Sequence, residues 1–179
     1  MTARAQYSPE EWNLVRKAPL MVGLAVMAAS PSGPFGIFKE TFAVGKLVGE
    51  TMLQDRSNTL ISSLVADLAT REGREQAQPT EISGMSPEQA KSHALDTCRR
   101  VAALVDQKAT REEAEGFKRW LLLLGRCAAE AAKEGGFLGI GGTRVSTQEI
   151  AALNEAAAAL GVPAQGREEG QGPSPISRP

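Results

Sequence analysis

Hydrophobic residues recur at intervals of three and four along most of the chain, and this spacing predicts helices. Four of the predicted helices begin with a capping box, in which a Ser or Thr hydroxyl accepts from the amide three residues later and a Glu or Gln there reaches back. The boxes are Ser8 with Glu11, Ser86 with Gln89, Thr110 with Glu113, and Ser146 with Glu149. In the first two boxes a proline follows the capping serine, at a position where its missing N–H costs nothing.

The pattern predicts an all-α fold, a bundle of about six helices. They span roughly Ser8 to Ala29, Phe38 to Leu53, Asn58 to Thr70, Pro87 to Gln107, Arg111 to Lys133 and Thr147 to Leu160. Pro19 lies inside the first helix and is expected to bend it, because proline removes one backbone hydrogen bond. The lone histidine, His93, is expected beside the apolar face of the fourth helix, on the surface or half-buried.

A helix, a glycine-rich loop and a second helix occur twice. Aligning the first helix with the fifth pairs Trp12 with Phe117 and Val15 with Trp120, and both helices end in loops, 30–36 and 135–142, that mix glycines with apolar residues. This pattern predicts two pseudo-symmetric helix–glycine loop–helix repeats. Chance alignment of two amphipathic helices would produce the same pattern, so both interpretations stay open.

The chain is expected to form one helical domain over 1–163. Its halves, 8–70 and 86–161, are joined by a segment, 71–85, that has neither periodicity nor apolar content over most of its length and should be an exposed linker. Residues 164–179 are rich in Gly, Pro, Ser, Arg and Glu, which predicts a disordered tail.

Composition narrows the classes of function. The 179 residues are 42% hydrophobic and 23% charged, with a net charge of −1, which provides no field to attract nucleic acid. The two cysteines, Cys98 and Cys127, lack the spacing of a metal site and are expected to be reduced, buried thiols. The chain starts without a secretory leader, and prolines and glycines interrupt its uncharged run over 18–38, so a soluble, cytoplasmic protein is expected.

The second loop region carries a resemblance. Glu134 and Gly135 followed by Glu149 resemble the acidic residue, glycine and downstream glutamate of the TerB-like, tellurite-resistance family, whereas the first half has Ser32 before Gly33 and retains only Glu40. The resemblance implies a divalent-metal-binding stress-response protein with Glu134, Glu149 and Glu40 as ligands. Glu130, one turn before Glu134, could join such a site. Solvent exposure and capping explain the same glutamates without a metal.

No catalytic motif is present, because His93 lacks a partnered nucleophile in the sequence pattern and neither glycine loop has the spacing of a nucleotide-binding loop. We therefore expect a non-enzymatic protein that has no cofactor other than the divalent cation implied by the TerB-like resemblance. We expect it to act by binding a protein partner or by forming a homo-oligomer.

The candidate partner-binding residues are the apolar side chains and one glycine of the two loops. They are Phe35, Gly36, Phe137, Leu138 and Ile140. The tight turns that glycines allow favour the interpretation that the same apolar side chains plug the core, and they would form a patch for a partner where they are exposed. The basic and apolar run 118–126 leaves a membrane-surface interaction as a further alternative, although its four consecutive leucines favour a helix buried on several sides.

Overall fold

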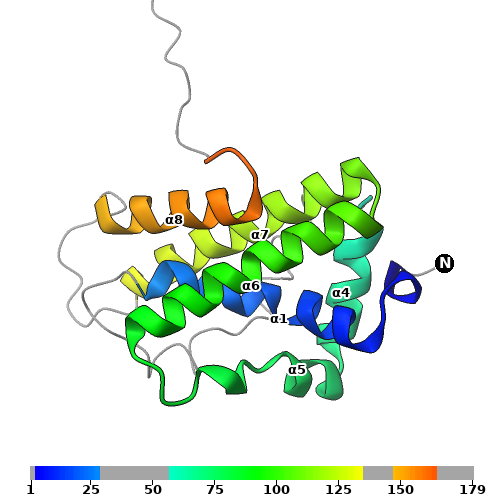
Figure 1. Ribbon diagram of the computed structural model, residues 1–179, viewed down its shortest axis with the longest axis horizontal. Coiled ribbons are helices and arrows are strands. Elements are labelled where there is room, and N and C mark those ends of the chain that lie inside the picture. Colours follow the sequence, from blue (N-terminus) through cyan, green and yellow to red (C-terminus); the bar gives the residue numbers. More distant parts are fainter. Residues whose placement is uncertain (1–2, 29–56, 135–146, 165–179) are drawn as a thin grey trace, which may run out of the picture.

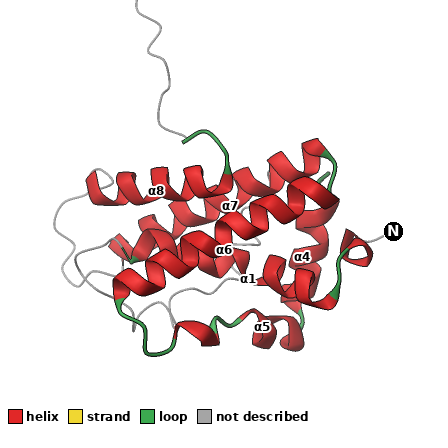
Figure 2. Cartoon of the chain, viewed as in Figure 1, coloured by secondary structure: helices red, strands yellow, loops and turns green. Residues whose placement is uncertain are grey.

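The computed structural model of the chain is a bundle of α-helices (Figure 1). It describes residues 3–28, 57–134 and 147–164, and for residues 130–134 and 149 it describes the backbone alone. Within these ranges there is no strand, which confirms the all-α prediction (Figure 2). The α-helices are α1 (Pro9–Met27), α4 (Thr59–Ala69), α5 (Arg71–Ala77), α6 (Pro87–Lys108), α7 (Arg111–Glu134) and α8 (Thr147–Leu160). Two short 3₁₀ helices, η1 (Ala3–Gln6) and η3 (Thr80–Ile82), accompany them.

Three of the predicted capping boxes are confirmed. The Ser8 hydroxyl accepts from the Glu11 amide while the Glu11 carboxylate accepts from the Ser8 amide, and Ser86 with Gln89 makes the same exchange. Thr110 and Glu113 form the third box. The fourth begins at Ser146, which lies outside the described residues. Satisfying the first amides of each helix in this way fixes where the helix starts.

Helix α1 runs through the middle of the bundle. It packs against α4, α5, α6, α7 and α8, and every residue from Ala18 to Met27 is buried. A helix that is apolar on all sides has to be covered on all sides, so the run beginning at Ala18 forms the centre of the core. The helix continues through Pro19 without an interruption.

Helices α1 and α7 approach closely at Gly125. A methyl group at this glycine would lie 3.2 Å from Cγ2 of Val22 and 3.3 Å from Cγ2 of Val26. The missing side chain therefore allows the two helices to pack at their observed distance.

The segment 71–85 differs from the prediction. Most of its side chains are exposed, as expected of a linker, but its first half is the helix α5 and η3 follows. Thr70 caps α5 by accepting from the Gly73 amide, and Ala77 is buried in the common core. A short helix with only two buried positions has too few apolar residues to produce a periodic pattern.

The predicted repeats are not visible as such. The first glycine loop and the predicted helix from Phe38 to Leu53 lie outside the described residues, as do the second loop and residues 165–179 of the predicted tail. In the described part, α1 from the first half lies against α6, α7 and α8 from the second. One hydrophobic cluster therefore includes residues of both halves.

Candidate interaction surface

The outer face of α8 is the part of the described surface that most resembles an interaction surface. Ile150 is 48% exposed and is the one large hydrophobic side chain of the described residues that is exposed. Asn154 and Ala158 are exposed on the same side of the helix, since residues spaced by four lie above one another, and the exposed Ala151 lies beside Ile150. We call these four residues the α8 face. None of the four is charged, and the charged Glu155 borders the face next to Ala151.

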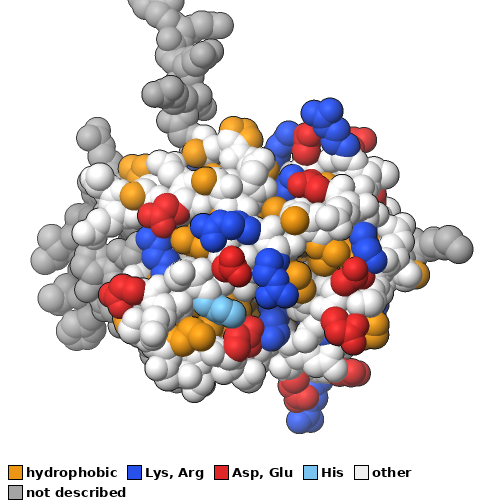
Figure 3. Space-filling model, in the orientation of Figure 1, with side chains coloured by type: hydrophobic (Ala, Val, Ile, Leu, Met, Phe, Trp, Pro, Cys, Tyr) orange, Lys and Arg blue, Asp and Glu red, His pale blue; other side chains and the backbone are white. Residues whose placement is uncertain are grey.

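Figure 3 shows hydrophobic atoms along the upper edge of the molecule, where Figure 1 places α8. Charged side chains of both signs are scattered over the rest of the view. Charged residues are depleted at the centres of protein interfaces. The uncharged α8 face is therefore a better candidate for an interface than the charged surface around it.

A shallow cleft lies beside the α8 face, between α7 and α8. It is lined by Leu122, Arg126, Leu153, Asn154 and Ala164. Its volume of about 20 Å³ holds a single water molecule, far below the few hundred cubic ångströms of a typical small-molecule pocket. The cleft borders the α8 face, and it is too small to enclose a substrate.

A cluster of polar side chains around Asp67 joins η1, α1, α4 and α5 beside the N-terminal half of α1. Arg16 of α1 donates to both carboxylate oxygens, with Nε 2.5 Å from Oδ2 and Nη2 3.2 Å from Oδ1. Trp12 Nε1 donates to Oδ2 at 3.2 Å, and Arg4 of η1 lies 3.4 Å from Oδ1. The side chains of Arg16 and Asp67 are only 5% and 8% exposed, so the pair is shielded from water.

The electrostatics of this cluster follow from its contacts. Burial alone would raise the pKa of Asp67, but hydrogen bonds from Arg16 and Trp12, with the charges of Arg16 and Arg4, outweigh burial and lower it. Arg16 also donates through Nη1 to Gln76 of α5. The arrangement holds η1, α1, α4 and α5 together, and both oxygens of the carboxylate are already engaged by cations.

A second polar cluster surrounds His93. Lys17 Nζ lies 3.0 Å from both carboxylate oxygens of Glu81, and His93 Nε2 lies 3.8 Å from one of them. The Nε2 atom is buried and has no hydrogen-bond partner among the described residues, while the side chain as a whole is half-buried. Among the described residues no hydrogen bond joins the imidazole of His93 to a Ser, Thr or Cys side chain, and the ion pair between Lys17 and Glu81 is the charged contact that joins α1 to η3.

The structure leaves most of the predicted site residues undescribed. Phe35, Gly36, Glu40, Phe137, Leu138 and Ile140 lie outside the described residues. Glu134 ends α7 and Glu149 lies in the first turn of α8, but neither side chain is described, nor is that of Glu130. Within the described part of the chain, no three His, Cys, Asp or Glu side chains are grouped so that they could hold a metal ion. The metal site therefore stays a prediction.

The remaining candidates are explained by packing. Trp12 and Trp120 are buried in the core, as is Cys98, where burial raises the pKa of the thiol to about 12. Cys127 is half-buried. The apolar side chains of the run 118–126 face the core for the most part, as its leucines indicate. Among the described helices, none combines the length and hydropathy needed to cross a membrane.

Sequence reasoning missed both Ile150 and Asp67. Ile150 stands among alanines in α8, and the spacing of small residues does not distinguish the inner from the outer side of such a helix. Asp67 had a visible signal, because it is an acidic residue adjacent to the buried Leu68, and Arg16 is a basic residue adjacent to the buried Val15. Their pairing across 51 positions is a tertiary contact that no local pattern reveals.

Comparisons of the chain with models of protein families, with curated proteins and with solved structures found no match.

Proposed function

We propose that this chain works by binding a protein, either a second copy of itself or a different partner, through the α8 face, and that it is not an enzyme. The observation that carries the proposal is the exposure of Ile150 on a face without charge. Exposed apolar side chains lose contact with water when a partner covers them, and this provides the driving force for association.

The neighbours of Ile150 support the same use of the surface. Ala151 and Ala158 are small, so a partner could approach the helix closely around the isoleucine. Asn154 offers an amide that donates and accepts hydrogen bonds, and Arg126 lies at the rim of the adjoining cleft. Protein interfaces usually combine apolar side chains with polar groups that make hydrogen bonds.

The test is a comparison of Ile150→Glu with Gln148→Glu. Both substitutions place one negative charge on an exposed position in the first turn of α8, so their effects on the helix itself are matched. Sedimentation velocity across a range of concentrations measures self-association of each variant. If the partner is a second copy, Ile150→Glu weakens association about ten- to hundred-fold, the value of burying one large aliphatic side chain, and Gln148→Glu leaves it unchanged.

A photo-crosslinking amino acid placed at 150, and at 148 as the control, extends the test to a different partner in cells. The proposal predicts a discrete adduct from position 150 that is absent from position 148. A wild-type protein that stays monomeric and yields the same adducts from both positions would exclude the α8 face as a binding surface.

A further inference from the structure

Helix α8 is held in the bundle mainly by small side chains. Its buried residues are Ala152, Ala156, Ala157, Ala159 and Leu160, and Leu153 packs against the core while partly exposed. The shorter helix α4 buries four large ones, Leu60, Ile61, Leu64 and Leu68. Because the free energy of burial scales with the apolar area removed from water, α8 gains less from docking than its length suggests.

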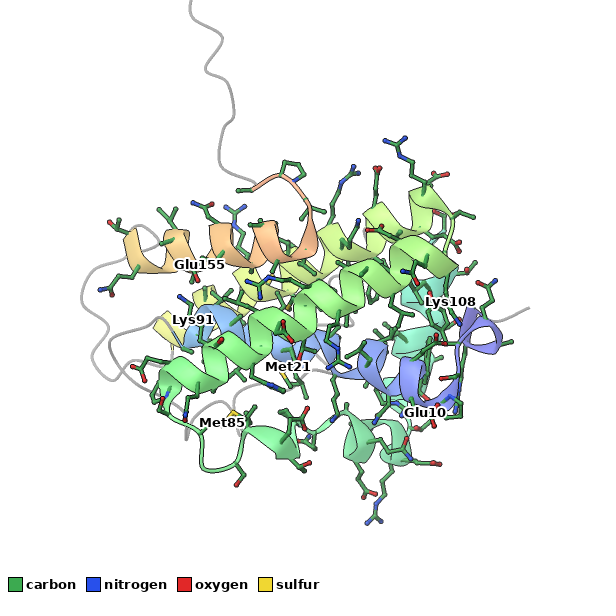
Figure 4. The ribbon with its side chains drawn as sticks, in the orientation of Figure 1. Glu10, Met21, Met85, Lys91, Lys108 and Glu155 are labelled. Carbon is green, nitrogen blue, oxygen red and sulfur yellow. The ribbon has the colours of Figure 1, made fainter. Side chains whose placement is uncertain are left out.

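The ion pair between α8 and α6 adds little to this. It joins Glu155 of α8 to Lys91 of α6, with Nζ 2.7 Å from Oε2. Figure 4 shows the two side chains pointing toward each other from α8 and α6. The side chains are 47% and 26% exposed, and ion pairs as accessible as this contribute little to stability.

The place of α8 in the chain also matters. It is the last helix of the described residues, and it lies along one side of the bundle across α1, α6 and α7. Among the described residues, no later helix has to move when α8 leaves. The helices beneath it keep their own contacts, since α1 packs extensively against both α6 and α7.

We propose that α8 is a detachable helix, which leaves the bundle as a unit while α1, α6 and α7 stay packed. Undocking uncovers the sides of these three helices that α8 covers. Elements that move during binding and regulation belong to the part of a fold with the lowest local stability. A partner with different affinities for the two states would shift the balance between them. This proposal does not depend on binding at the α8 face.

Native-state hydrogen exchange followed by mass spectrometry tests the proposal on the whole chain. An isolated helix of 14 residues is marginal in water even when it is rich in alanine, so the amides of an undocked α8 exchange freely. The proposal predicts that α8 amides exchange faster than the slowest amides of α1, α6 and α7, through an opening that is far more frequent than global unfolding.

Two matched substitutions decide whether the opening is separate from global unfolding. Ala103 of α6 and Ala151 of α8 are both exposed alanines, and glycine at either lowers helix stability by a similar amount. Ala103→Gly should speed exchange of the slowest α1, α6 and α7 amides about five-fold and leave α8 exchange unchanged, because α6 stays helical in both docked and undocked states. Ala151→Gly should speed α8 exchange about five-fold.

The outcome of Ala103→Gly is decisive. If α8 exchanges as slowly as α1, or if Ala103→Gly accelerates α8 as much as it accelerates α6, then α8 unfolds only with the whole bundle and the proposal is wrong. This result would leave binding at the α8 face untouched, since a fixed helix presents Ile150 equally well.

Discussion

At the scale of single residues, Asp67 has the largest expected effect on stability. Its carboxylate accepts two hydrogen bonds from the Arg16 guanidinium, and both side chains are shielded from water. Removing one member of such a pair leaves the charge of the other buried without compensation. We expect Asp67→Asn to lower the free energy of unfolding by about 3 kcal/mol, as measured by urea denaturation.

The matched control is Asp96→Asn. Asp96 is 65% exposed and its nearest cation, Arg99, lies 3.8 Å away on the same helix. The same chemical change in water should have no measurable effect on the urea midpoint. Equal effects of the two substitutions would show that the contacts of Asp67 do not stabilise the fold.

At the scale of helices, the packing of α1 on α7 depends on the missing side chain of Gly125. Gly125→Leu adds four carbon atoms where even the first would lie within 3.3 Å of two valine methyl groups. Leucine is the better helix former, so any loss of stability comes from the contact between the helices. We expect Gly125→Leu to destabilise the protein by about 2 kcal/mol or more, in thermal unfolding followed by circular dichroism.

Gly125→Ala and the pair Gly125→Leu with Val22→Ala complete this test. Alanine requires a shift of only a few tenths of an ångström and should cost much less than leucine. Shortening Val22 makes room beside position 125 and should recover part of the loss caused by leucine. A Gly125→Leu variant as stable as the wild type would mean that α1 and α7 separate easily.

The helices themselves were largely predictable, and the reasons are specific. The boxes at Ser8, Ser86 and Thr110 place the starts of α1, α6 and α7 correctly, because a cap is a local interaction between residues three apart. Helix α5 was missed because Thr70 caps it without a Glu or Gln partner three residues on, and because it lacks an apolar stripe. The α8 face could not be predicted, since exposure of Ile150 depends on how α8 is docked.

At the scale of the whole molecule, several carboxylates that join different helices have lowered pKa values. Burial alone would raise the pKa of Asp67 and of Glu81, but their hydrogen bonds and neighbouring cations outweigh it. The side-chain hydrogen bond with Lys108 lowers the pKa of Glu11, linking α1 to the end of α6. Each such group therefore binds a proton less readily in the folded state than in the unfolded chain.

The direction of the pH dependence follows. A lowered pKa contributes stability that is complete above the ordinary value, near 4, and is lost as the pH falls through the folded value. We expect the urea midpoint of the wild type to fall steeply below about pH 4, and that of Asp67→Asn to fall less steeply. Parallel curves for the two proteins would indicate that Asp67 titrates normally in the folded state.

The central place of α1 also has a consequence for how the protein is made. The ribosome releases α1 before the helices that cover it, and the residues of α6 and α7 follow up to roughly 100 residues later, a delay of about 5 to 20 s at ordinary rates of synthesis. During that interval the apolar stretch from Ala18 to Met27 lacks its final partners. Molecular chaperones that shield nascent apolar segments should therefore engage this chain while it is still being translated.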